Sequence, residues 1–541
     1  MRATPTIDQF LSEVGRIVKS KNGAMLQDYL VLEPHGGQYP AIYTSMINEV
    51  RQVYPKGAED ALEDRCSRAL PELQELDDGS SWTAFIRFIA QYLTFLRDID
   101  VQNLDKTQLE AYNLLSELVQ KCNSALSHGS MGIIILPTVI ACSRMLAKLA
   151  IVLDKRPELL ANVRQQAADD GSETRETLPE RAANTLRQAF QTCLNDRTGT
   201  ATGVRDGKPD GKKAGIYTIA NLCLKILFQC HKSRSADTIF NNIQNQSPPL
   251  AVYPRPERIT YLYYLGRFQF SNNHFYRALL ALQAAYDQCP PQRLNQRRLI
   301  LIYLVTCNII LGRFPSQQLY QQPEAAGLME KFHPICVAIA KGNLTHFRLL
   351  TDMDTPNASW FIHYKIFYQI RSRCEIMVWR SLVRRTFTLH GDRGDPTTRR
   401  APTVDLQDVV ALAQLLETSA NTALNRQSNV DPDFDGVDDV ELDPLLPDSY
   451  EIESIVSSLV HQGLLGGFIS HKQLRFAIQG AKKKGAMAAG FPNPWAIITA
   501  RCSDEVPGWK RDISGAAVKA GGARVVNLSG ARPAGSGPAG A

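Results

Sequence analysis

The stretch YLYYLGRFQFSNNHFYRALLALQAAYDQCPP, residues 261–291, decides the fold of this chain. It can be laid on the tetratricopeptide pattern, a helical hairpin that repeats about every 34 residues. Gly266 falls where a missing side chain lets the second helix approach, and Ala278 and Ala285 fall at its small positions. No second copy follows in register. Residues 299–311, LILIYLVTCNIIL, predict a further buried helix that is too short to span a bilayer.

A second stretch, YEIESIVSSLVHQGLLGGFISHKQLRFAI (residues 450–478), changes its period half-way. The first half has apolar residues at helical spacing, and Gly463 stands where that helix should end. The second half alternates apolar and polar residues after a polar turn, which predicts a small β-hairpin. An earlier helix is expected to start at Pro402 and Thr403. These signals indicate a winged helix, so we predict an all-α fold: a tetratricopeptide-like helical solenoid capped by a C-terminal winged helix.

Four separated phrases within residues 216–478 resemble the PCI family. They are YYLGRFQFSNNHFYRALLAL, RRLILIYLVTCNIILGRFPS, FHPICVAIAKGNLTHF and LVHQGLLGGFISH. The resemblance is greatest to the branch that holds the mRNA-export PCI subunit of the TREX-two complex, its animal relatives and the signalosome-subunit-twelve-like proteins. It implies a PCI domain, and as partners a large PCI-type export scaffold subunit and a small acidic, disordered subunit shared with the proteasome lid.

Composition and pattern divide the chain into five parts. Flexible segments are expected where Gly, Pro and charged residues replace apolar periodicity. The parts are an N-terminal helical region (1–194), a flexible insertion (195–214), the helical solenoid part of the PCI domain (215–398), a winged helix with an acidic insertion at 427–448 (399–480), and a basic, then Gly/Ala-rich tail that is partly disordered (481–541).

The composition indicates where in the cell the protein is located, but it does not by itself identify a function. Lys and Arg number 60 against 54 Asp and Glu, a formal net charge of +6, so local clusters must identify any nucleic-acid surface. The N-terminal residues lack the apolar core of a signal peptide. Eleven cysteines without a C-x-x-C pair are typical of reduced core thiols. We expect no membrane anchor and a cytosolic or nuclear location; the resemblance implies the nucleus, at its envelope or pore, with some cytoplasmic protein.

No stretch carries a complete catalytic or metal-binding motif. DPDFDGVDDVEL (residues 431–442) begins like an EF-hand, but Leu442 stands where that loop needs a bidentate carboxylate. We interpret it as a solvated acidic loop. The sequence has neither an H-E-x-x-H zinc pattern nor a G-x-S-x-G nucleophile elbow. We therefore expect no catalytic residue, metal or cofactor, and predict that the protein is not an enzyme.

One basic cluster surrounds the predicted wing and is a candidate nucleic-acid surface. Lysine and arginine at a wing neutralise phosphates, which predicts binding of RNA and DNA without sequence specificity. The alternative is a solvated charge run, part of it a nuclear import signal. Glu451 and Glu453, at the start of the recognition helix, argue against base reading. The cluster comprises His471, Lys472, Arg475, Lys482, Lys483 and Lys484, with Arg399 and Arg400 before the first helix of the winged-helix module.

A second basic cluster lies on a long helix predicted over residues 362–389. Arg371, Arg373 and Arg380 accompany Trp379 there. A disordered acidic partner loses entropy on binding, so it needs aromatic anchors as well as charge pairing. We predict that these four residues bind the acidic subunit.

These observations favour a non-enzymatic PCI scaffold subunit of a nuclear, transcription-coupled mRNA-export complex of the TREX-two type. It would contact partner subunits and nucleic acid through its winged-helix region. The alternative is a signalosome-subunit-twelve-like PCI protein in a deneddylation or splicing-linked complex. A sequence-specific transcription factor is disfavoured by the acidic recognition helix.

Overall fold

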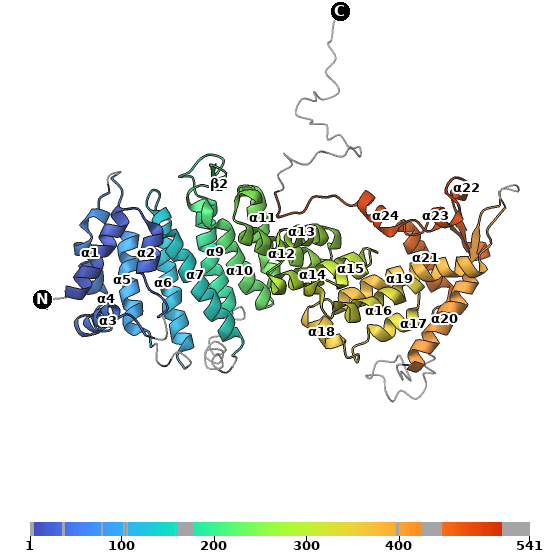
Figure 1. The fold of residues 1–541 in the computed structure, drawn as a ribbon, viewed down its shortest axis with the longest axis horizontal. Coiled ribbons are helices and arrows are strands. Elements are labelled where there is room, and N and C mark those ends of the chain that lie inside the picture. The colour runs from blue at the N-terminus through green and yellow to red at the C-terminus, as the bar shows by residue number, and fades with distance from the viewer. Residues whose placement is uncertain are drawn as a thin grey trace, which may run out of the picture.

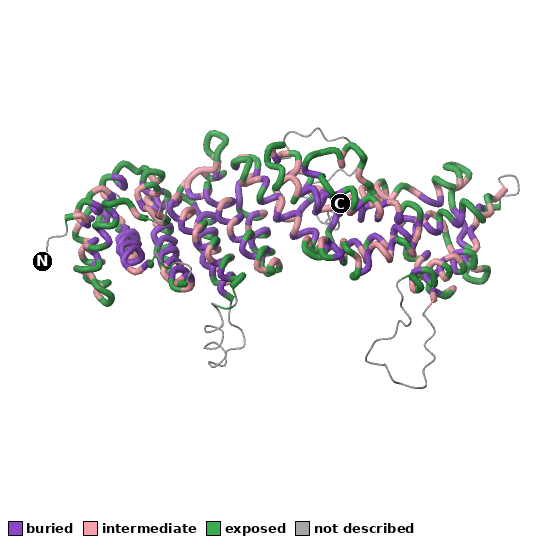
Figure 2. The backbone as a smooth tube through the Cα atoms, turned by 60° about the horizontal axis from the view of Figure 1, so that its bottom comes forward, coloured by how far each residue is buried: buried purple, intermediate pink, exposed green. Residues whose placement is uncertain are grey.

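The protein is an elongated rod of stacked helices with the winged helix at one end (Figure 1). A computed structural model describes residues 5–34, 38–76, 79–100, 103, 106–156, 158, 177–395, 400–423 and 446–510. Arg399, most of the predicted acidic insertion and the Gly/Ala-rich end of the tail lie outside these residues. Buried residues follow one another along the whole rod (Figure 2), so a single apolar core joins its two ends.

The N-terminal region consists of antiparallel helices packed against one another. Its longest helix, α7, is long and apolar enough to cross a bilayer, but 56% of its most apolar window is buried against neighbouring helices. We interpret α7 as a core helix. The helices are α1 (Pro5–Lys19), α2 (Gly23–Tyr29), α3 (Ala41–Val53), α4 (Glu59–Ala69), α5 (Thr83–Asp98), α6 (Gln108–Leu126), α7 (Gly132–Asp154) and α9 (Leu178–Leu194).

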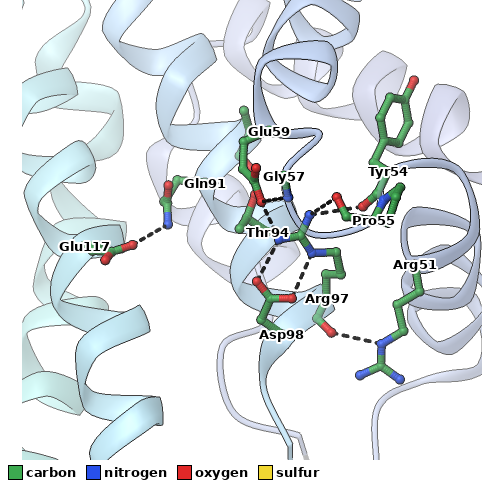
Figure 3. Close-up of polar contacts among 11 residues, drawn as sticks. Arg51, Tyr54, Pro55, Gly57, Glu59, Gln91, Thr94, Arg97, Asp98 and Glu117 are labelled. Atoms are coloured by element: carbon green, nitrogen blue, oxygen red, sulfur yellow. Dashed lines mark hydrogen bonds and ion pairs between the residues drawn. The ribbon is translucent and has the colours of Figure 1, made fainter.

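A buried arginine joins α5 to the segment between α3 and α4 (Figure 3). The Arg97 guanidinium donates to Glu59 Oε1 (2.7 Å), to both carboxylate oxygens of Asp98 (2.8 Å each) and to the carbonyl oxygens of Tyr54 (3.0 Å) and Pro55 (3.1 Å). Its hydrogen bond to Glu59 lowers the pKa of that carboxyl to about 2. Because all of its donors face oxygen acceptors, this charge can lie inside the N-terminal region.

Residues 195–214, predicted to be a flexible insertion, pack onto α7, α9 and the connection between α6 and α7 in the structure. Lys212 is only 3% exposed; its ammonium donates to the carbonyl oxygen of His128 (2.7 Å) and its backbone N–H to Asp196 Oδ2 (2.9 Å). This buried lysine fixes a segment whose composition resembles a linker. The same segment includes a β-hairpin formed by β1 (Val204–Arg205) and β2 (Lys208–Pro209).

The solenoid continues the same antiparallel stacking. The predicted hairpin is present as α12 and α13: Ala278 is fully buried, and a Cβ on Gly266 would lie 2.6 Å from Leu282 Cγ. The long helix predicted over 362–389 is wrong at its start, because Lys365 takes a left-handed conformation (φ +55°) that separates two helices. The helices are α10 (Ile216–Gln229), α11 (Asp237–Gln246), α12 (Arg255–Ser271), α13 (Phe275–Gln288), α14 (Leu294–Ile310), α15 (Gln317–Tyr320), α16 (Leu328–Lys341), α17 (Leu344–Leu350), α18 (Ala358–His363) and α19 (Phe367–His390).

The C-terminal module has the elements of a winged helix. The predicted helix end at Gly463 (φ +76°) and the predicted hairpin are confirmed. The helix expected from Pro402 and Thr403 starts later, because Val404 is buried in a third strand. The elements are β3 (Thr403–Asp405), α20 (Leu406–Ala423), α21 (Ser449–His461), β4 (Gly467–Ser470) and β5 (Arg475–Ile478), in an antiparallel sheet of order β3-β5-β4.

The chain beyond the wing returns to the solenoid. Three short helices follow Gly480: α22 (Ala481–Lys484), α23 (Ala486–Gly490) and α24 (Pro494–Arg501). From α24 the chain runs back along the rod toward α11 (Figure 1). Residues 503–510, called the strap here, lie against α11, α12 and α13, so the described part of the predicted tail is folded.

Candidate nucleic-acid and partner interfaces

The wing is a tight turn that raises one lysine into solvent. β4 and β5 are joined by a short 3-10 turn, His471–Gln473, which ends at Leu474 in a left-handed conformation (φ +47°). Lys472 lies at the exposed middle of this turn. It makes no ion pair with any residue that the structure describes.

Three other predicted phosphate contacts have carboxylate neighbours within the protein. His471 Nδ1 lies 2.8 Å from Glu453 Oε2 of the recognition helix α21, and Arg475 Nε lies 3.7 Å from Asp405 Oδ2 of β3. The Arg400 guanidinium lies 2.6 Å from Asp392 Oδ2. Each of these three side chains therefore already faces a carboxylate of the protein, an arrangement that the sequence does not reveal.

The strongest positive feature near the wing is α22. Its three lysines, Lys482, Lys483 and Lys484, are all exposed, and none forms an ion pair within the described chain. Gly480 precedes them in a left-handed conformation (φ +80°), which lets the chain turn from β5 into this short helix. Lys472 lies in the turn before β5 and the other three lysines follow β5; the four exposed lysines together are called the lysine surface here.

Two of the predicted partner-binding residues lie inside the fold. Arg380 is 7% exposed; its guanidinium donates to the carbonyl oxygens of Leu464 (3.2 Å), Phe491 (3.1 Å) and Pro492 (2.6 Å). Trp379 is also 7% exposed. Arg380 therefore attaches the winged helix and the following loop to α19, and neither side chain is available to a partner. The prediction failed because it used spacing along one helix, whereas burial depends on what packs against that helix.

The other two predicted partner residues remain at the surface of α19. Arg373 is exposed and lines a cavity of about 320 Å³ between the solenoid and the winged helix, while Arg371 is half-buried. Tyr368, one turn before Arg371, is 63% exposed, and Lys365 is exposed just before the helix begins. Charge and an aromatic side chain thus meet near the start of α19. Tyr368 and Arg371 are three positions apart, a spacing that places two side chains on the same face of a helix. The sequence could have indicated this surface in that way.

The sheet of the winged helix has a free edge. Among the described residues β4 pairs only with β5, whereas β3 is also bridged to Asp392. Phe468 in β4 is 56% exposed. Tyr450, in the first turn of α21, and Leu415 on α20 are 73% and 64% exposed. An exposed strand edge that carries a large apolar side chain suits protein contact.

The described residues contain no obvious reactive centre. They hold no group of three His, Cys, Asp and Glu side chains placed to bind a metal ion. Nine of the eleven cysteines are buried, and burial raises the pKa of the Cys66 and Cys374 thiols, that of Cys66 to about 12. Thiols in such surroundings are inert.

Known proteins similar to this chain carry the PCI name. A PCI domain-containing protein of Schizosaccharomyces pombe is 28% identical over 66% of this chain and 71% of its own length. The chain is a relative of the PCI-domain proteins. PCI domain-containing protein 2 of Xenopus laevis is 24% identical over 59% of this chain and 67% of its own, and a protein CSN12 homolog of Neurospora crassa is 25% identical over 57% and 61%. No family model matches. A helical solenoid capped by a winged helix is thus both the fold observed and the architecture implied by PCI relatives.

Proposed function

We propose that this PCI-domain relative is a non-enzymatic scaffold subunit of a nuclear, transcription-coupled mRNA-export complex of the TREX-two type. Its similarity to proteins named PCI domain-containing protein 2 from fly, frog, fish and worm carries the proposal. The same proposal places it in the nucleus, at the envelope or pore, with some protein in the cytoplasm. The elongated rod supports a scaffold role, because a long surface can contact several partners at once.

Nucleic acid is proposed to bind the lysine surface formed by Lys472 and by Lys482–Lys484 of α22. These four ammonium groups are exposed and free of carboxylate partners within the described chain, so each can neutralise a phosphate. Glu451 is exposed at the start of α21, and Glu453 contacts His471, so the recognition helix does not suit base readout. Binding should therefore be independent of sequence and similar for RNA and DNA.

Charge reversal of Lys482, Lys483 and Lys484 to glutamate tests this surface. Binding of single-stranded RNA and duplex DNA should weaken, and the slope of log K against log salt should fall by roughly two to three units. A matched control reverses three exposed lysines of the N-terminal region, Lys56, Lys121 and Lys155, with the same change in net charge. Equal weakening by both triple variants would show that overall charge, not the lysine surface, binds nucleic acid.

A large PCI-type export scaffold subunit is the proposed partner at the free edge of β4. The outer edge of β4 can extend the sheet with another chain, and Phe468 of β4 supplies an apolar anchor there. Phe468→Asp should remove that subunit from the purified complex. Ile42→Asp, a substitution of another largely exposed apolar residue, on α3, should leave it bound. Retention of the partner by Phe468→Asp would refute this contact.

A small acidic, disordered subunit, the one shared with the proteasome lid, is the second proposed partner. The exposed start of α19 offers Lys365, Tyr368, Arg371 and Arg373. An acidic chain can pair with these cations while an apolar side chain packs on Tyr368. Tyr368→Ser combined with Arg371→Glu should abolish co-purification, whereas moderate salt should weaken it only partly. Complete loss at modest salt would indicate charge contact alone.

A second function remains supported by the CSN12 homologs of Neurospora crassa and Gibberella zeae, which are 25% and 24% identical to this chain. It is a role in a deneddylation or splicing-linked complex. Mass spectrometry of the complex purified from its own cells separates the two. A PCI-type export scaffold subunit supports the first, and signalosome or splicing subunits support the second.

A further inference from the structure

The strap is seated in a groove of the solenoid as a bound peptide would be. Val506 is 1% exposed, so its side chain is enclosed although it lies on a segment without helix or strand. Gly508 passes close to Leu265 of α12 and Phe240 of α11: a Cβ there would lie 3.0 Å from Leu265 Cδ1 and 3.2 Å from Phe240 Cβ. The groove thus has a pocket for one apolar side chain and a narrow place that glycine fits.

The hydrogen bonds in the groove are made largely to the strap's backbone. Tyr261 donates its hydroxyl to the carbonyl oxygen of Gly508 (2.5 Å), and Gln244 Oε1 accepts from the Gly508 N–H. Gln269 Nε2 donates to the carbonyl oxygen of Pro507 (3.4 Å). Tyr261 and Gln269 are buried at 0% and 4% exposure, so their polar atoms need these partners. Backbone recognition of this kind gives affinity to any peptide that can adopt the same path.

The strap also contains a turn that is closed by a hydrogen bond within the strap itself. Trp509 N–H donates to the carbonyl oxygen of Val506 (3.0 Å), which closes a four-residue turn. Pro507 occupies the second position and Gly508 the third, where its φ of +93° is the value a type II turn requires. A sequence that forms this turn before binding loses less entropy in the groove. Outside the turn, Tyr276 donates to Asp504 Oδ1 (2.6 Å) at the exposed end.

We propose that the groove between α11 and α12 is a peptide-binding site, which accepts a Val-Pro-Gly-Trp turn with an acidic residue two positions before the valine. The chain fills it with its own strap, and a peptide of the same chemistry can fill it in trans once the strap is displaced. The chemistry is an apolar side chain in the Val506 pocket, a glycine at the narrow place and a carboxylate near Tyr276. Occupation by the strap ties the segment after the winged helix to helices that precede it by more than 200 residues.

The full-length chain carrying Val506→Asp provides an open groove for the test, because a carboxylate cannot enter the apolar pocket without a partner. Glu505→Gln is the matched control: Glu505 is exposed, and its side chain makes no hydrogen bond or ion pair with the described chain. A fluorescein-labelled peptide of residues 503–510 is the probe. We expect saturable binding to Val506→Asp and at least about tenfold weaker binding to the wild type and to Glu505→Gln, whose straps occupy the groove.

Two further measurements identify the site and guard against misfolding. A peptide carrying Gly508→Val should bind Val506→Asp at least about tenfold more weakly, because its side chain would collide with Leu265 and Phe240. Circular dichroism must show native helicity for Val506→Asp. If Val506→Asp lacks native helicity, the full-length variant Gly508→Ala, a smaller change, is used in its place. It is tested with the same wild-type peptide as the probe. A folded open-groove variant that fails to bind the probe overturns the proposal, as does equal binding to wild type and variant.

Discussion

Replacing Arg380 by methionine should loosen the winged helix from the solenoid. Arg380 is buried, and its guanidinium serves the carbonyl oxygens of Leu464, Phe491 and Pro492. Each buried carbonyl left without a donor costs about 1–3 kcal/mol. Removal of the buried cation offsets part of this loss of stability, because the charged form of Arg380 is itself unfavourable there. Burial and the charge of Arg384 lower the pKa of Arg380 to about 10. We expect a net loss of about 2–4 kcal/mol.

Urea unfolding followed by tryptophan fluorescence measures this loss, and limited proteolysis shows where the opening occurs. Cleavage should appear first after α21, in the segments that the guanidinium holds. Arg384→Met is the matched control: Arg384 lies one turn further along α19 and is exposed. It should be neutral or slightly stabilising, because it removes a repulsive charge. An Arg380→Met midpoint equal to that of the control would refute the assignment of Arg380 as the attachment.

Three further changes test the packing of the rod. Ala278→Leu should cost about 1–3 kcal/mol by overpacking the α12–α13 crossing, seen as a lower melting temperature; an unchanged value would mean that the crossing is not close. Gly342→Ala should destabilise by about 1 kcal/mol or more, because φ is +65° and a Cβ would lie 2.5 Å from the Leu382 nitrogen; a melt equal to wild type contradicts that geometry. Arg97→Met should remove the stabilisation that depends on ionised Glu59. In the wild type this contribution is complete above the ordinary pKa of 4.5 and is lost as pH falls toward about 2. In melts from about pH 6 to about pH 2, the two proteins should therefore differ most at the upper end of the range. A gap independent of pH would contradict this.

The sequence predicted the features that depend on local pattern. The α12–α13 hairpin follows from small residues at a close crossing, and the end of α21 follows from Gly463. Strand β3 was missed because three residues are too few to show alternation.

Features that depend on distant packing were not predictable in the same way. Lys212 makes a linker-like segment part of the core, and Arg380 is buried because residues 84 to 112 positions later pack against it. The carboxylates that face His471 and Arg475 come from α21 and β3. No periodicity in the sequence carries that information.

The strap affects the order in which the protein can be completed during synthesis. Most contacts between elements join near neighbours in the chain, so the helices of the rod can pack as they leave the ribosome. The strap contacts are different, because they join residues 228 to 264 positions apart. Until residue 510 has emerged, the hydroxyl of Tyr261 and the amide of Gln269 have no strap to bind and face water or another chain. The groove therefore becomes exposed early in synthesis and is filled by the strap last. A nascent chain presents an open groove to other molecules near the ribosome, whereas in the finished chain the strap covers it.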